Sequence, residues 1–244
     1  MATFILIALR PKVFKKIHKQ FLFRGISLGT LLALGYIFQT FGLTQTTVAK
    51  TGFITGLYAV FTPLIASGIL KKVISKIQWL AVGIAAIGLA FLSLNGLFIG
   101  IGELLVLISA IFYAAHIVGL SEWSNEHDTY ALTVIQLGTV GILCALASIK
   151  NGFQAPPDSG VWSAIIYTAI FASAFAFIIQ TWVQSFMSAT SVGIILTMEY
   201  IFAALFGVWL GHEALTVRVL VGGSLVIAAM YIIISSESNE RFTP

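Results

Sequence analysis

Charged side chains are scarce in this chain. Of its 244 residues only 9% are Asp, Glu, Lys or Arg, whereas 59% are hydrophobic, and the mean hydropathy is +1.01. A soluble domain carries about 25% charged and about 45–50% apolar residues, so these charges are too few to cover a globule of this length. The composition argues against a soluble enzyme, a nucleic-acid-binding domain and a disordered protein. It favours a helical protein that crosses the bilayer several times.

Cysteine and the common cofactor motifs are also missing or nearly so. Cys144 is the single cysteine, so an intramolecular disulfide cannot form. The sequence has no Gly-rich phosphate loop, no His-Glu-x-x-His helix and no paired-cysteine metal site. We therefore expect no cofactor, no metal ligands, no catalytic residues, no nucleic-acid partner and no enzymatic activity. The net charge of +4 is interpreted as loop charge at a membrane.

The apolar residues form runs of about the length that spans a bilayer. A transmembrane helix needs about 20 apolar residues, and eight stretches approach this length: residues 21–43, 47–70, 77–94, 97–119, 130–148, 161–186, 188–210 and 216–235. A ninth stretch, Ala2 to Leu9, has about half that length and lacks the flanks of a signal peptide. The predicted fold is an all-α polytopic membrane protein with eight full transmembrane helices and an N-terminal half-helix.

The basic residues are distributed unevenly between alternate loops. If the loops before residue 21 and after residue 70 are cytoplasmic, ten Lys and Arg fall on the inner side and three on the outer side. The outer three are Lys50, Lys150 and Arg218. Positively charged loops stay in the cytoplasm, so the sequence predicts a cytoplasmic C-terminus.

Two segments of the chain resemble each other at an offset of 141 residues. Between residues 36–61 and 177–202, six of 26 positions are identical, including the pairs Gln39/Gln180 and Thr40/Thr181. A chance match between two apolar helices is the alternative. The predicted orientations of the two segments are opposite, which indicates inverted repeats, an arrangement found in many secondary transporters.

Several motifs resemble the drug/metabolite transporter (DMT) superfamily of the EamA type. Residues Thr46 to Tyr58, followed by Pro63-Leu64, are similar to its fourth helix, and Gly102-Glu103-Leu104-Leu105 to the start of its sixth. The motifs similar to its ninth and tenth helices are Ser188-Ala189-Thr190, Met198-Glu199-Tyr200, Gly211-His212-Glu213 and the run from Leu220 to Ile227.

The resemblance implies ten helices in two inverted five-helix repeats, and transport of small metabolites, often outward. On this chain, residues 1–95 would form a first repeat that lacks the first helix and part of the second. Residues 96–236 would form the second repeat, and residues 237–244 a cytoplasmic tail. The chain departs from the family pattern at Lys71-Lys72, where an acidic residue is usual, and at Tyr200, where a proline is usual.

Polar side chains inside the spans are the candidate substrate-binding residues, because such groups are costly in lipid and mark functional sites. They are Gln39, Thr51, Thr55, Tyr58, Tyr113, His116, Gln180 and Glu199. Thr51, Thr55 and Tyr58 share one helix face, and Glu199 is the only carboxylate deep within a predicted span. The alternative for each is a structural hydrogen bond within or between helices.

Three charged residues near helix ends are expected to have no such role. Lys50 is expected to snorkel outward from the first turn of its helix, and Glu103 and Glu213 to lie at the membrane interface.

The sequence as a whole predicts a secondary transporter in the cell membrane that exports a small polar metabolite by alternating access. The alternative is a truncated, non-transporting membrane protein or an interaction subunit. Its expected partners are the substrate and the bilayer, and pairing of two copies stays open.

Overall fold

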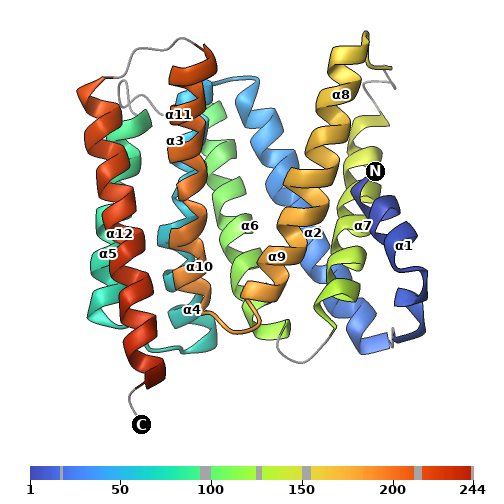
Figure 1. The fold of residues 1–244 in the computed structure, drawn as a ribbon, viewed down its shortest axis with the longest axis horizontal. Helices are drawn as coiled ribbons and strands as arrows, with labels where there is room; N and C mark the ends of the chain where they lie inside the picture. Colours follow the sequence, from blue (N-terminus) through green and yellow to red (C-terminus); the bar gives the residue numbers. More distant parts are fainter. Residues whose placement is uncertain (17–18, 94–99, 125–127, 150–154, 212–215, 243–244) are drawn as a thin grey trace. The chain divides into compact units, whose positions relative to one another are not determined.

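Helix is the regular secondary structure of the described chain (Figure 1). The computed structural model describes residues 1–244 except 17–18, 94–99, 125–127, 150–154, 212–215 and 243–244. The first elements are α1 (Ala2–Leu9), the 3₁₀-helix η1 (Pro11–Lys16), α2 (Lys19–Leu43), α3 (Val48–Gly56), α4 (Tyr58–Leu70), α5 (Lys76–Ser93), α6 (Ile101–Trp123) and α7 (Thr129–Ser148). They are followed by α8 (Ser159–Tyr167), the π-helix η3 (Thr168–Phe175), α9 (Ala176–Val183), α10 (Ala189–Leu196), α11 (Met198–Gly211) and α12 (Val217–Phe242).

Six helical segments in the described residues are long and apolar enough to cross a membrane. They are Lys19–Leu43, Lys50–Leu70, Ile101–Trp123, Thr129–Ser148, Ser159–Val183 and Val217–Ser236. Two shorter apolar helical stretches, Lys76–Phe91 and Ala189–Ala203, accompany them. The predicted fold class is thus confirmed at the level of an all-helical protein with several membrane-spanning segments.

The chain divides into two compact units, each built from two separate stretches of sequence. Unit 1 comprises Met1–Ile37 and Gly119–Met187, and unit 2 comprises Phe38–Val118 and Ser188–Pro244. Helices α2 and α6 contribute residues to both units. The units are therefore not the two halves of the sequence, because each unit takes helices from both halves.

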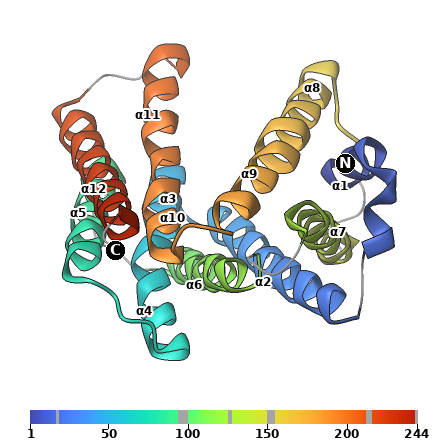
Figure 2. The ribbon, with the colours of Figure 1, turned by 60° about the horizontal axis from the view of Figure 1, so that its bottom comes forward.

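In unit 1 the short helix α1 packs against the start of α7 (Figure 2). The Tyr130 hydroxyl donates to the carbonyl oxygen of Leu6 at 2.6 Å, and Leu6 itself is buried. Arg10, which ends α1, lies 3.5 Å from a carboxylate oxygen of Asp128, with its guanidinium 5.5 Å from the centre of the Tyr130 ring. These contacts make the half-length helix an integral part of the unit.

Unit 1 also contains a helix that is not regular along its length. The helix predicted over residues 161–186 consists of α8, the π-helical segment Thr168–Phe175 and α9. A π-helix bonds residue i to i+5 and occurs mostly as short bulges. Neither the apolar content nor the residue types of this segment indicated the change of helix type.

The closest helix pair of unit 2 is formed by α5 and α12, which run side by side (Figures 1 and 2). A Cβ built on Gly88 would lie 2.8 Å from the carbonyl oxygen of Gly222 and 2.9 Å from Cγ2 of Val226. Ala85 and Ala229 are fully buried in the same core. Small side chains let helix backbones approach closely in membranes, so these residues determine how near the two helices lie.

Two predicted helices of unit 2 each contain one tight turn. The amide of Leu57 bonds to the carbonyl of Ile54 at 3.2 Å, between α3 and α4, and Thr197 bonds to Ile194 at 3.0 Å, between α10 and α11. Such i→i+3 bonds are typical of a 3₁₀ turn. The hydroxyl of Thr197 donates to that same carbonyl oxygen of Ile194 at 2.6 Å, which favours the tightening.

The starts of these two helices are capped alike. The side-chain oxygen of Thr47 accepts from the amide of Lys50 before α3, and that of Ser188 accepts from the amide of Ser191 before α10. The two caps are 141 positions apart. Hydroxyl caps satisfy amides that a helix start leaves unbonded, so each helix start is set locally by its own sequence.

Two helices continue well past the ends of their predicted spans. Helix α6 continues to Trp123, four residues beyond the predicted span 97–119. Helix α12 continues to Phe242, beyond the apolar run that ends at residue 235. The sequence marks where a helix stops being apolar, but polar residues can continue the helix.

We expect Gly88→Ala to destabilise unit 2, because the added methyl group would overlap the backbone of α12. Overpacking of this kind costs about 1–3 kcal/mol, and thermal unfolding of the purified protein in detergent would measure it. Gly83→Ala, on the same helix with nothing within 4 Å of the added Cβ, is the matched control. Equal melting temperatures for the two variants would contradict the close approach of α5 and α12.

Candidate functional site

Three polar side chains from three helices meet in unit 2. The Gln39 amide nitrogen on α2 donates to Oγ1 of Thr55 on α3 at 2.9 Å. The Tyr113 hydroxyl on α6 donates to the Gln39 amide oxygen at 2.7 Å. Three of the residues predicted from sequence are therefore joined in one hydrogen-bonded group, in which Gln39 uses both ends of its amide.

The polar residues predicted to share one face of the helix over residues 47–70 have hydrogen-bond partners of two kinds. Thr51 donates to the carbonyl of Thr47 at 3.0 Å, and Thr62 donates to that of Tyr58 at 2.7 Å. Both threonines are buried, and both bond to their own helix, as the structural alternative predicts. Thr55, by contrast, accepts a hydrogen bond from Gln39 on α2.

Tyr58 carries a buried hydroxyl group that has no hydrogen-bond partner in the described residues. The side chain is 5% exposed and packs in a core cluster with Ala59, Ala114 and Ile117. A buried polar group without a partner costs about 1–3 kcal/mol. The Tyr58 hydroxyl is therefore a donor that a further hydrogen-bonding group would stabilise.

Glu199 lies in the first turn of α11 and is exposed, within electrostatic reach of Tyr58 and Tyr200. A carboxylate that faces lipid costs at least about 2.5–3.5 kcal/mol. An exposed carboxylate in an apolar helix is thus expected to face water or a ligand. Tyr58, Tyr200 and Glu199 form what we call the tyrosine–glutamate cluster.

His116 and Gln180 are on other helices than the residues of this cluster. His116 is buried on α6, one turn after Tyr113. Gln180 belongs to unit 1 and donates to the amide oxygen of Gln184 at 3.1 Å, on the same helical stretch. Gln39 and Gln180, which the repeat pairs with each other, therefore have different hydrogen-bond partners.

The Lys50 side chain forms an ion pair. Its Nζ atom lies 3.1 Å from Oε1 of Glu103, which is only 7% exposed. The same carboxylate accepts from Oγ1 of Thr46 at 2.7 Å and from the amide of Gly100 at 2.9 Å. The ion pair joins the first turn of α3 to the first turn of α6, and compensates two charges that would otherwise be costly near lipid.

A second polar group, in unit 1, was missed in the sequence. Thr181 lies 3.0 Å from the hydroxyl of Thr133 and accepts from the amide of Gln136 at 3.1 Å. The Gln184 amide donates to the hydroxyl of Ser121 at 2.8 Å. All five side chains are buried. Gln136 and Gln184 are glutamines within apolar spans, as Gln39 and Gln180 are, and could have been singled out on the same grounds.

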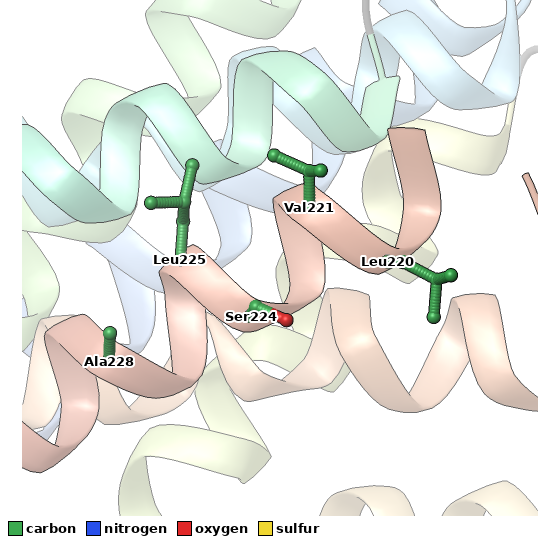
Figure 3. Close-up of a pocket in the computed structure, with 5 residues that line it drawn as sticks. All are labelled: Leu220, Val221, Ser224, Leu225 and Ala228. Carbon is green, nitrogen blue, oxygen red and sulfur yellow. The ribbon is translucent and has the colours of Figure 1, made fainter. Parts of the chain in front are cut away.

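The shallow hollow on α12 has a different character (Figure 3). It is lined by Leu220, Val221, Ser224, Leu225 and Ala228, so Ser224 supplies its one polar side chain. Val221 and Leu225 point toward the neighbouring helix in Figure 3. This surface offers few groups that could recognise a polar solute. In the ranges described, no three His, Cys, Asp or Glu side chains gather as a metal site would require.

Comparison with known proteins identifies the family. The sequence profile of the EamA-like transporter family matches residues 1–94 and 100–235. The chain belongs to this family. The match confirms the resemblance carried by the Thr46–Tyr58 and Met198–Tyr200 motifs, and an EamA-like transporter is a multi-pass membrane protein that acts on a small molecule.

Other transporters and a solved structure are similar to this EamA-like protein. An uncharacterized transporter of Archaeoglobus fulgidus is 34% identical over 209 residues, which cover 86% of this chain and 68% of the relative. The uncharacterized transporter YoaV of Bacillus subtilis is 24% identical, with coverage of 93% and 80%. A chain of known crystal structure shares the fold, with a TM-score of 0.71 at 14% identity over 92% of this chain and 89% of that one.

We expect the single variants Lys50→Met and Glu103→Gln each to lower the melting temperature in detergent. Removing one partner leaves the other charge uncompensated in a mostly buried place. The double variant Lys50→Met/Glu103→Gln should recover part of the loss, as a double-mutant cycle would measure. Additive losses in the double variant would show that the two side chains do not stabilise each other.

Proposed function

We propose that this EamA-like transporter exports a small polar solute across the cell membrane by alternating access. The proposed solute-binding residues are Gln39, Thr51, Thr55, Tyr58, Tyr113, His116, Gln180 and Glu199. In this proposal the eight predicted spans and the half-helix form two inverted repeats, residues 1–95 and 96–236, that rock about the site. The outward direction follows the family resemblance.

The observation that carries the proposal is the convergence of Gln39, Thr55 and Tyr113 from three different helices. Amide and hydroxyl groups on separate helices can exchange hydrogen bonds with a solute when the helices move. The unpartnered hydroxyl of Tyr58 and the exposed carboxylate of Glu199 add a donor and an acceptor in the same unit. A few directed polar groups in an apolar surrounding are typical of a small-molecule site.

The repeats are supported by the local structure of the aligned residues. The helix caps Thr47 and Ser188 differ by 141 positions, the same offset as the aligned identities. The tight turns at Leu57 and Thr197 differ by 140 positions. The offset of 141 pairs Tyr58 with Glu199. Tyr58 directly follows the turn at Leu57, and Glu199 lies two residues after Thr197. Discontinuous helices in corresponding positions of two repeats often mark a transporter's binding site.

We expect purified protein in liposomes to carry a labelled solute from a panel of small polar metabolites, and Glu199→Gln to reduce the flux at least about tenfold. A hydrogen bond to a charged group contributes about 1.5–3 kcal/mol, which corresponds to such a factor in affinity. Glu122→Gln, at the end of α6, is the control. A panel solute that is carried equally by parent and Glu199→Gln protein would count against the proposed site.

We also expect the C-terminus to be cytoplasmic. Fusions of a fluorescent protein and of a periplasmic phosphatase to Pro244 would report the side, since each is active in one compartment. Fluorescence without phosphatase activity is the expected result, because ten of the 13 Lys and Arg residues then face the cytoplasm. Phosphatase activity at this terminus would reverse the proposed orientation and with it the order of the inner and outer loops.

A further inference from the structure

Tyr200 lies against two glycines of α3. A Cβ built on Gly52 would lie 3.4 Å from Cε1 of the Tyr200 ring, and one built on Gly56 would lie 3.0 Å from Cε2. The ring thus covers both glycines, which are one helical turn apart on the same face. The ring also packs with the core cluster of Leu89, Ile201 and Val226. A side chain larger than hydrogen at Gly56 would occupy the place of the ring.

The backbone of Tyr200 belongs to the turn before α11. The amide of Tyr200 donates to the carbonyl of Thr197 at 3.1 Å, within the tight turn that separates α10 from α11. The turn is therefore bonded through Tyr200, and the side chain of the same residue contacts α3.

We propose that Tyr200 is a positioning residue of the transport site: its ring, packed on Gly52 and Gly56, fixes the rotation of the first turn of α11 and so the direction of the Glu199 carboxylate. The inference rests on the proposed role of Glu199 in transport. Adjacent residues on a helix are about 100° apart. A helix turn held by one of them cannot rotate without carrying the other away from Tyr58.

The position of this carboxylate has a physical consequence. Tyr58 is buried with a hydroxyl that lacks a partner in the part of the chain that the structure describes, and Glu199 is near enough to interact with it electrostatically. Functional groups must be held within about 0.5 Å of their productive place by packing of the residues around them. The Tyr200 ring supplies such packing against α3, and the backbone of the same residue bonds the turn before α11.

Labelling of Glu199 by dicyclohexylcarbodiimide tests the inference without knowledge of the substrate. This apolar reagent attacks carboxyl groups in apolar surroundings, and peptide mass spectrometry separates adducts at Glu199 from those at Glu122. The ratio of the two labelling rates corrects for a general loosening of the protein. Loss of the ring frees the first turn of α11 to rotate and turns the Glu199 carboxylate away from the packed surroundings of Tyr58, so we expect Tyr200→Ala to lower the ratio about threefold or more. Tyr200→Phe, which keeps the ring, should match the parent.

Substitutions of glycine test the contact between the Tyr200 ring and α3 from the side of α3. Gly56→Ala should lower the ratio as Tyr200→Ala does, because its Cβ would lie 3.0 Å from the ring and 2.7 Å from Cδ1 of Leu89. Gly68→Ala, on the next helix with nothing within 4 Å of the added Cβ, should match the parent. Phe202→Ala, which removes an exposed ring from α11, is the control for loss of an aromatic side chain.

The outcomes separate this inference from the proposed function. The role of the ring is overturned if Tyr200→Ala leaves the labelling ratio unchanged, or if Tyr200→Phe lowers it as much as Tyr200→Ala does. This holds even if Glu199→Gln abolishes flux. A lowered ratio in Tyr200→Ala and Gly56→Ala supports the positioning contact. If Glu199→Gln then leaves flux intact, the contact stands as described and the transport role of Glu199 is overturned.

Discussion

The bilayer requires every polar group in a spanning helix to find its partner within the protein, and the polar contacts of this chain follow from that requirement. Gln39 uses both ends of its amide, Glu103 accepts from three groups, and Gln136 and Gln184 of unit 1 bond to hydroxyls on neighbouring helices. Tyr58 is the exception near the proposed site, since its hydroxyl is buried and has no partner among the described residues. A buried polar group without a partner is a reasonable candidate for contact with a ligand.

The positions of the apolar helices along the chain were predictable from sequence because apolar length is itself the physical cause of membrane insertion. The predicted boundaries of α1 agree with the structure, and those of α7 differ by one residue at the start. The π-helical segment Thr168–Phe175 and the tight turns at Leu57 and Thr197 were not predicted. Those features depend on whether an amide bonds to the carbonyl three, four or five residues before it. The hydrophobic pattern of a whole span does not indicate which of these bonds forms.

The candidate site was predicted in part, for a similar reason. The rarity of amides in lipid indicated Gln39, and helical spacing placed Thr55 and Tyr113 on polar faces, but neither rule says which faces meet. The pairing of Lys50 with Glu103 joins residues 53 positions apart, and the sequence does not say that the first turns of α3 and α6 lie near each other. The family pattern marked Tyr200 as a departure, whereas its contact with Gly52 and Gly56 became visible only in the structure.

The composition of the two units bears on how the protein is made. Residues 1–37 of unit 1 are completed by residues 119–187, and residues 38–118 of unit 2 by residues from 188 onward. During synthesis the first helices of each unit are therefore made before the helices that complete the same unit. The contact of Tyr130 with Leu6 can form only after more than half of the chain has emerged. Neither unit can be excised as one continuous fragment, because each is built from two separate stretches of the sequence.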